Sequence, residues 1–277
     1  MPSYELRGRT AIVTGAGSGI GRAIASSLAK RGCHLALADI NAAGLAETVQ
    51  SASGTGVRVS SHALDVADEA AVAAFPAVVR GEHGGAALLF NNAGVALSGT
   101  FEQVSAADFD WLLSINFWGV VRMTRAFLPV LREADEARLV NLSSLFGLIA
   151  PPGQTAYCAS KFAVRGFSES LRQELRGSPV GVTVVHPGGV ATSIARNARI
   201  GAEVPRESLE RQRKMFERAL RLPPEVAGET IVRAVERRRP RVIVGQDAKL
   251  ASTIERFMPV SYWPWLERMS SPRRAAR

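Results

Sequence analysis

The stretch TGAGSGIGRAIA, residues 14–25, follows a short apolar run and decides how the chain begins to fold. Gly15, Gly19 and Gly21 allow a tight turn whose backbone can approach a pyrophosphate at the positive N-terminus of the following helix. The strict G-x-G-x-x-G spacing is absent, because Ile20 stands where its last glycine would be. Glycines also end strands for purely structural reasons, so this turn, with Ser18 inside it, suggests a dinucleotide site without establishing one.

Strand and helix patterns alternate beyond this turn. The apolar runs are continuous, which is typical of strands covered by helices on both faces. They lie at residues 10–15, 34–39, 57–64, 86–94, 138–144, 181–189 and 241–245. Ala-rich segments with helical periodicity occupy residues 19–31, 42–53, 68–82, 105–132, 156–176 and 224–237. This alternation predicts an α/β fold: a doubly wound, Rossmann-type parallel sheet of seven strands flanked by helices.

Two stretches depart from the alternation. Residues 190–223 carry helix formers but no strand pattern and follow a strand end, so we expect a helical lid over a ligand crevice. Residues 246–277 extend beyond the last strand with an apolar stripe, the sequence YWPW and a basic tail. No low-complexity linker or internal repeat divides the sequence. Residues 1–277 are therefore expected to form one dinucleotide-binding and catalytic domain with a C-terminal extension.

The composition is that of a globular protein. Apolar residues make up 47% of the 277 residues, which is ample for a core. No run of about 18 apolar residues is present, so no membrane-spanning helix is expected. The first residues also lack the apolar stretch of a signal peptide. Cys33 and Cys158 offer no disulfide framework and are interpreted as reduced thiols, which favours a cytoplasmic location.

The net charge of +9 is unevenly distributed along the chain. Residues 1–194 balance 15 basic against 15 acidic residues, whereas residues 195–277 hold 19 basic and 10 acidic ones. No nucleic-acid recognition motif accompanies this excess, so no nucleic acid is expected as a partner. We favour a solvated, arginine-rich surface over a patch for a membrane or an acidic partner.

Asp39 ends the second strand pattern, 18 residues beyond Gly21. A carboxylate at this position can accept hydrogen bonds from both adenosine ribose hydroxyls, and it repels a 2′-phosphate. No Arg or Lys occupies residues 16–18 or 40–41 to attract such a phosphate. NAD is therefore favoured over NADP. The alternative is that Asp39 only caps the next helix.

A tyrosine and a lysine stand four residues apart in TAYCASK, residues 155–161. This spacing places Tyr157 and Lys161 on one face of a helix, which fits a plain helix surface as well as an active site. Ser144 precedes the tyrosine by thirteen residues, and Asn116 lies in a helical pattern where its amide needs a partner. No spacing typical of metal ligands is present, so no metal is expected, and His186 is interpreted as a packing residue.

Together these motifs resemble those of the short-chain dehydrogenase/reductase family over about residues 7–245. The resemblance rests on TGAGSGIG, NNAG (91–94), Asn116, Ser144, YCASK and HPGGVAT (186–192), in the family's order and spacing. It implies a single-domain NAD(P)-dependent enzyme acting on CH–OH groups, with Tyr157 as the general acid/base. Lys161 would lower the pKa of Tyr157 and bind the nicotinamide ribose, and Ser144 would donate to the substrate oxygen. Asn116 would hold a water in the proton relay.

The resemblance also implies further cofactor contacts. They are Asp65 and Val66 at the adenine, Asn92, Ala93 and Gly94 where the fourth strand passes close to the cofactor, and Val190 and Thr192 at the nicotinamide carboxamide. An ordinary cap or turn role is the alternative for each of these residues.

The expected substrate is apolar. Apolar residues follow Ser144 and recur in the lid: Leu145, Phe146, Leu148, Ile149, Ile194, Met215 and Phe216. No Arg or Lys lies between Leu145 and Lys161 to clamp an anion. We therefore expect hydride transfer between NAD(H) and a hydrophobic secondary alcohol or ketone that is steroid-, terpenoid- or lipid-like. One alternative is a 3-oxoacyl (CoA or ACP) reductase, because the lid is rich in arginine. Another is a non-catalytic dinucleotide-binding sensor or scaffold, although the filled catalytic set favours an enzyme.

The resemblance implies a homodimer or homotetramer that assembles through the helices at 105–132 and 156–176. For residues 246–277 we favour packing over the substrate pocket or a neighbouring subunit. Peripheral contact with a membrane is the disfavoured alternative, because Pro259 and Pro264 interrupt any long amphipathic helix.

Overall fold

Seven parallel strands form the central sheet of the computed structural model, which describes residues 3–205 and 220–270. The strands run in the order β3-β2-β1-β4-β6-β7-β9, and all seven predicted strands are present. Their bounds are β1 (Thr10–Thr14), β2 (His34–Asp39), β3 (Val59–Ala63), β4 (Leu88–Asn91), β6 (Ala137–Leu142), β7 (Val180–Pro187) and β9 (Arg241–Val244). Parallel neighbours require crossover connections, which the intervening helices supply.

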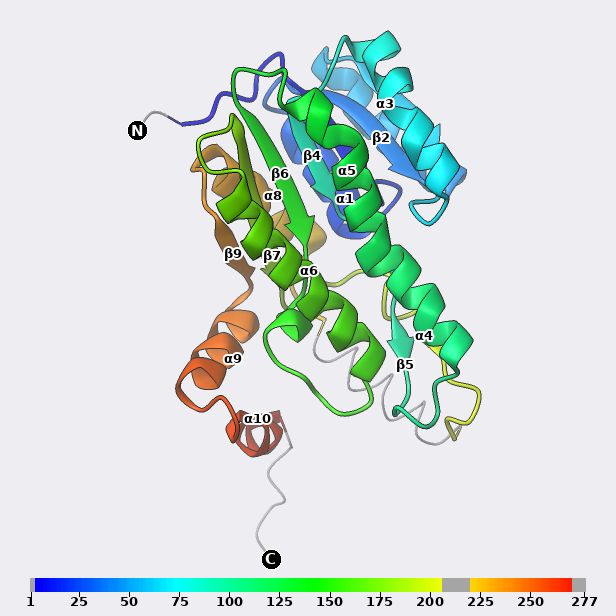
Figure 1. Ribbon diagram of the computed structural model, residues 1–277, viewed down its shortest axis with the longest axis vertical. Coiled ribbons are helices and arrows are strands. Elements are labelled where there is room, and N and C mark those ends of the chain that lie inside the picture. Colours follow the sequence, from blue (N-terminus) through cyan, green and yellow to red (C-terminus); the bar gives the residue numbers. More distant parts are fainter. Residues whose placement is uncertain (1–2, 206–219, 271–277) are drawn as a thin grey trace, which may run out of the picture.

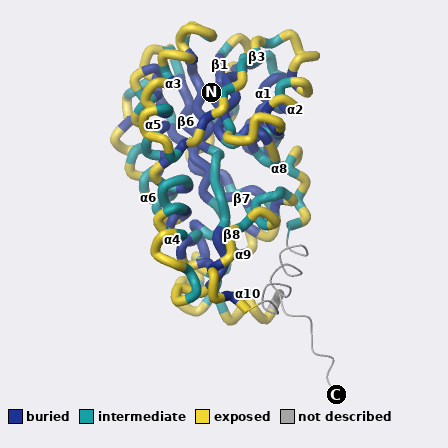
Figure 2. The backbone as a smooth tube through the Cα atoms, turned by 90° about the vertical axis from the view of Figure 1, so that its right-hand side faces the viewer, coloured by how far each residue is buried: buried dark blue, intermediate teal, exposed yellow. Residues whose placement is uncertain are grey.

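Helices cover both faces of the sheet (Figure 1). One face carries α1 (Gly19–Ala29), α2 (Ala42–Ala52) and α8 (Pro224–Glu236), and the other carries α3 (Glu69–His83), α5 (Gly119–Leu131) and α6 (Thr155–Glu174). Every residue of β1, β4 and β6 is buried, and Figure 2 shows these strands enclosed by helices with exposed outer faces. Continuous apolar runs are therefore what these strands need, because successive side chains enter opposite cores.

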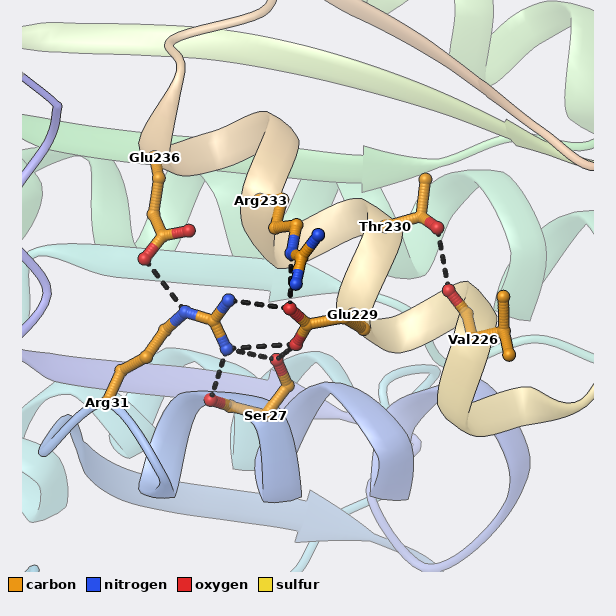
Figure 3. A network of polar contacts seen from close by, with 7 residues as sticks. All are labelled: Ser27, Arg31, Val226, Glu229, Thr230, Arg233 and Glu236. Carbon is orange, nitrogen blue, oxygen red and sulfur yellow. Dashed lines mark hydrogen bonds and ion pairs between the residues drawn. The ribbon is translucent and has the colours of Figure 1, made fainter.

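Helices α1 and α8 are joined by a polar network above their apolar contact (Figure 3). The Arg31 guanidinium pairs with Glu229 and with Glu236, each at 2.8 Å. Ser27 donates to Glu229 at 2.8 Å, and Arg233 pairs with the same carboxylate. These contacts hold the helix that follows the glycine turn against a helix about 200 residues further along the chain.

Two segments differ from the prediction. The helix expected over 105–132 is divided: α4 (Ala106–Leu113) leads through a π-helical turn (Ser114–Trp118) into α5. In the described parts of the expected helical lid, 190–205 and 220–223, there is no helix, and β8 (Arg199–Ile200) pairs with β5 (Leu97–Ser98). A two-residue strand carries no periodicity, so the sequence pattern could not indicate it. Residues 206–219 of that lid lie outside the described residues.

The C-terminal extension forms two helices, α9 (Gln246–Phe257) and α10 (Tyr262–Ser270), which lie below the carboxyl end of the sheet (Figure 1). Pro259 falls between them and Pro264 lies in the first turn of α10, where proline is tolerated. Within residues 3–205 and 220–270, no helix has both the length and the apolar character needed to cross a membrane.

Candidate active site

The carboxyl ends of the central strands meet at one edge of the sheet (Figure 1), where ligands bind in open parallel sheets. The strand order reverses at β1, which lies between β2 and β4. The loops after β1 and β4 approach closely at this point, since a Cβ added to Gly15 would lie 2.8 Å from the Cα of Ala93. The fold thus places the glycine turn against the NNAG segment at the topological switch point.

The glycine positions of the turn have no room for a Cβ. A Cβ on Gly21 would overlap the carbonyl oxygen of Gly15, and Gly15 has a φ of +65°, which favours glycine. Asn92 Nδ2 donates to the carbonyl oxygens of Thr14 (2.9 Å) and Gly15 (3.1 Å) and so joins the two loops. The Ser18 side chain does not cap α1. A bare backbone at a helix N-terminus fits a pyrophosphate.

Asp39 ends β2 beside this turn. Its Oδ2 accepts from the N–H of Gly17 (2.8 Å), and its Oδ1 accepts from the N–H of Asn41 (2.9 Å). Helix α2 is capped by Asn41, whose Oδ1 accepts from the N–H of Gly44 (3.1 Å). The alternative in which Asp39 is only the helix cap is therefore wrong, and its carboxylate is directed at the glycine turn.

Arg22 is a cation near the turn that lies outside residues 16–18 and 40–41, where the sequence has no Arg or Lys. Its guanidinium donates to the carbonyl oxygens of Gly17 and Gly44, and it pairs with Glu47 at 2.7 Å. Because Glu47 neutralises the charge of Arg22, the Asp39 carboxylate gives this part of the site a net negative charge. Such a charge disfavours a 2′-phosphate.

Ser144, Tyr157 and Lys161 come together at the carboxyl end of β6. Ser144 precedes the 3-10 turn Leu145–Gly147, and its Oγ accepts from the N–H of Phe146 (3.1 Å). Tyr157 and Lys161 lie one turn apart on α6, with Lys161 Nζ 5.7 Å from the centroid of the tyrosine ring. Lys161 Nζ also donates to the carbonyl oxygen at position 142 (3.2 Å), which anchors it to the end of β6.

Burial dominates the protonation of this pair. It raises the pKa of Tyr157 to about 12, while the nearby Ser144 hydroxyl acts in the opposite direction. Burial also lowers the pKa of Lys161 to about 8. Burial therefore sets the pKa of Tyr157 in the protein without a bound cofactor. That Lys161, together with a positively charged nicotinamide, lowers this pKa stays a prediction.

Asn116 is completely buried in the π-helical turn. Its Oδ1 accepts from the N–H of Val95 (2.8 Å), and its Nδ2 donates to the Val95 carbonyl oxygen (2.9 Å) and to Ser160 Oγ (3.2 Å). Ser160 Oγ donates in turn to the carbonyl oxygen of Tyr157 (2.7 Å). The amide therefore has protein partners at both ends and connects the loop after β4 to α6.

Gly94 lies close to both Asn116 and Lys161. A Cβ at this position would lie 3.1 Å from Asn116 Oδ1 and 3.4 Å from Lys161 Nζ. A side chain there would crowd both polar groups. The position of the two polar side chains therefore depends on a glycine at residue 94.

His186 does more than pack. It is completely buried at the end of β7, and its Nδ1 lies 3.0 Å from the carbonyl oxygen of Ser144. Burial lowers its pKa to about 4, so the imidazole is neutral at pH 7. An acceptor at this distance assigns the proton to Nδ1, and the buried Nε2 has no partner among the described residues. Strand pairing between β6 and β7 brings this residue to Ser144, which the sequence pattern did not indicate.

Asp65 and Val66 follow β3. Asp65 is exposed, and its Oδ1 accepts from the N–H of Ala67 (2.8 Å). Val66 is buried beneath α5, where a Cβ on Gly119 would lie 2.7 Å from its Cγ2. One carboxylate oxygen of Asp65 thus has the turn role that was the alternative for this residue, and the other oxygen is left for a ligand. The Val66 side chain belongs to the core.

The segment after β7 reaches the glycine turn. Val190 is buried and forms a β-bridge with Leu222, so its side chain also belongs to the core. Thr192 is half-buried, and its Cγ2 lies 2.9 Å from the position of a Cβ on Gly19. Ile20 packs from the turn against the core. Loops after β1, β4, β6 and β7 therefore meet in one place.

This arrangement combines a proton-exchanging phenol, a hydroxyl, an ammonium and a glycine cradle. These groups can bind a dinucleotide and polarise a substrate oxygen beside it. Among the residues that the structure describes, no group of three or more His, Cys, Asp or Glu side chains could hold a metal ion.

Known proteins are similar to this chain in sequence and fold. The family model described as short chain dehydrogenase matches residues 9–202. A Mycobacterium tuberculosis protein named as the oxidoreductase SadH is 45% identical, and the match covers 95% of this chain and 94% of that protein. A short-chain dehydrogenase/reductase from Burkholderia phymatum, solved in complex with NAD, is 32% identical with a TM-score of 0.85, covering 92% and 95% of the two chains. A metagenomic short-chain oxidoreductase, solved with NADP, is 28% identical with a TM-score of 0.71, covering 87% and 98%.

Proposed function

Since the chain belongs to the short-chain dehydrogenase family and is an oxidoreductase of that family, we propose that it transfers a hydride between NAD(H) and a hydrophobic secondary alcohol or ketone. One observation carries this proposal: Ser144, Tyr157 and Lys161 converge beside the loops that form the glycine cradle. A binding protein has no physical need for a phenol, a hydroxyl and an ammonium at this point.

The residues divide the proton chemistry between them. When bound, the dinucleotide supplies or accepts the hydride. Tyr157 Oη exchanges the proton with the substrate oxygen, and its raised pKa makes it a proton donor at neutral pH, which suits ketone reduction. In the oxidative direction Lys161, charged below its pKa of about 8, is the cation that stabilises the phenolate. Ser144 donates to the same substrate oxygen and holds it in place.

We propose NAD as the cofactor. The solved relatives bind NAD or NADP, so the choice depends on the local charge. Asp39 directs its carboxylate at the glycine turn, and Arg22 is matched by Glu47. A ribose with free hydroxyls can use the carboxylate as an acceptor, whereas a 2′-phosphate meets a like charge.

We propose that the substrate is hydrophobic, because the half-buried residues next to Ser144 are apolar. Phe146 lies with its ring centroid 6.1 Å from that of Tyr157, in an edge-to-face arrangement. Leu145 and Ile194 are half-buried as well. Leu148 and Ile149 are buried instead, so we leave them out of the substrate wall. Met215 and Phe216 lie outside the described residues.

The direct experiment is a panel of hydrophobic secondary alcohols and their ketones, with turnover followed by nicotinamide absorbance. Tyr157→Phe should lower kcat by about a thousandfold, within the range that general acid/base catalysis contributes. NADH binding should change little. Tyr4→Phe, which also removes one buried phenol oxygen, is the matched control and should keep full activity. If the wild type binds NADH but turns over none of the panel, a sensor or scaffold becomes the better interpretation; unchanged turnover in Tyr157→Phe excludes the assigned acid.

We also propose self-association through the face formed by α5 and α6. Trp118 is 49% exposed and Phe162 is 38% exposed there. Phe117 contacts both Trp118 and Phe167, so the aromatic residues form one group. Changing Trp118 and Phe162 to serine should shift the chain to a monomer in light scattering; an unchanged mass would exclude this face.

A further inference from the structure

The C-terminal extension is hydrogen-bonded to two different loops of the active site. At its start, Asp247 Oδ2 accepts from the backbone N–H of Gly189 at 2.7 Å. After the turn into α10, Tyr262 Oη accepts from the backbone N–H of Ala150 at 2.9 Å. Gly189 follows β7, and Ala150 lies between Ser144 and Tyr157. The two contacts therefore reach two separate loops that border the reaction site.

The Asp247 carboxylate fits between two glycines of the surrounding backbone. A Cβ on Gly188 or on Gly245 would overlap the Asp247 carboxylate, and Gly245 has a φ of +100°. Both positions must therefore be glycine for the carboxylate to reach the N–H of Gly189. The carbonyl oxygen of Gly189 accepts from the N–H of Leu222 (3.0 Å), so the segment is held from both sides.

This segment continues directly to Thr192, which contacts the glycine turn at Gly19. A displacement of Gly189 would therefore be passed to the part of the chain that faces the cofactor cradle. The carboxylate of Asp247 fixes that segment. Asp247 is too far along the chain from Gly189 for one sequence motif to include both residues.

The Tyr262 contact holds the loop between Ser144 and Tyr157. Residue 149 is buried and its carbonyl oxygen accepts from Cys158 Sγ (3.9 Å), whereas Ala150 is exposed and its N–H is taken by Tyr262. The loop that joins Ser144 to Tyr157 is thus held on one side by α6 and on the other by α10.

We propose that Asp247 and Tyr262 are positioning residues, and that α9 and α10 form a strap that fixes the cofactor side and the substrate side of the cleft. The proposal rests on the proposed function. Asp247 sets the geometry of the segment that receives the nicotinamide end of the dinucleotide. Tyr262 sets the substrate loop. The extension thereby determines cofactor affinity at one end and substrate fit at the other.

The test compares variants of the full-length chain at each end of the strap. Asp247→Ala should weaken NADH binding by about tenfold, within the range by which a residue that does not contact the ligand changes its affinity. Asp247→Asn retains an amide oxygen that can accept from Gly189 and should stay within about twofold of the wild type. Glu5→Ala is the matched control, because the Glu5 carboxylate likewise accepts from a backbone N–H (Arg7, 3.3 Å), but it precedes β1 and so lies at the amino end of the strands, opposite the cleft. Its NADH affinity should equal that of the wild type.

The second arm measures KM and kcat. Tyr262→Phe should raise the KM for the alcohol severalfold while kcat and NADH affinity stay unchanged, because only the substrate loop loses a partner. Equal NADH affinity of the wild type and Asp247→Ala overturns the proposal, as does an equal loss in Glu5→Ala or an unchanged KM in Tyr262→Phe. A wild-type chain that binds neither NADH nor NADPH would instead overturn the proposed function, which this experiment detects before any variant is compared.

Discussion

Replacing His186 by asparagine is expected to flatten the dependence of stability on pH between pH 6.5 and about 4. Burial lowers the pKa of His186 from 6.5 to about 4 in the folded chain, so in this window the unfolded chain binds more protons than the folded one. The free energy of unfolding therefore falls as the pH is lowered from 6.5 towards 4. Above pH 6.5 the imidazole is neutral in both states and contributes no such slope.

The magnitude follows from the size of the shift. A pKa difference between 6.5 and about 4 corresponds to about 3 kcal/mol of unfolding free energy, most of it lost by about pH 4.5. The side chain is completely buried, so solvent screening does not reduce this figure. His62 and His83 also have their pKa values lowered by burial and act in the same direction. Because they titrate in the wild type and in the variant alike, the difference between the two chains isolates His186.

Urea unfolding at about pH 7.5 and at about pH 4.5 measures the effect. Asparagine preserves a donor that can reach the carbonyl oxygen of Ser144 but does not titrate in this range. The variant should lose about 2–3 kcal/mol less than the wild type between the two pH values. If His186→Asn folds poorly, His186→Gln provides the same non-titrating amide. Equal losses in the wild type and in both variants would refute a buried neutral imidazole at this position.

Three further substitutions test the charge at the ribose position, the contact between α1 and α8, and the packing of the glycine turn. Asp39→Ala should shift the ratio of kcat/KM values for NAD and NADP towards NADP by about tenfold, since about 1.4 kcal/mol of charge discrimination is removed; an unchanged ratio would mean that another group reads the ribose. Arg31→Met should lower the urea midpoint at neutral pH, and its difference from the wild type should shrink as the pH falls from 4.5 towards 2, because hydrogen bonding to Arg31 lowers the pKa of Glu229 to about 2. A pH-independent difference would exclude the ion pair as its source. Gly21→Ala should abolish NADH binding, measured by fluorescence titration, because its Cβ would overlap the carbonyl oxygen of Gly15; wild-type affinity would contradict this packing.

The sheet was predictable from the sequence because its strands are buried on both faces, which leaves continuous apolar runs that depend little on context. The division of the helix at Ser114–Trp118 was not, because a π-helical turn of five residues is too short to leave a sequence pattern of its own. The raised pKa of Tyr157 could not be predicted for a different reason. It follows from burial, which is set by tertiary packing.

Long-range contacts account for the rest of what the sequence could not indicate. His186 reaches Ser144 only because β7 pairs with β6. Asp247 reaches Gly189 because β9 ends beside β7. Neither contact has a fixed spacing along the chain, so no sequence motif can indicate it. Both contacts nevertheless hold backbone segments that belong to the motifs around Ser144 and in HPGGVAT.

The contact between α1 and α8 has a consequence for the order in which the chain can fold during synthesis. Ile24 and Leu28 of α1 share a core with Ile231 and Val235 of α8, so the helix that follows the glycine turn leaves the ribosome long before its partner exists. Loop closure over about 200 residues is a slow step. Until it occurs, the nascent dinucleotide half carries an uncovered apolar face, and a chain that stops before α8 would carry it permanently.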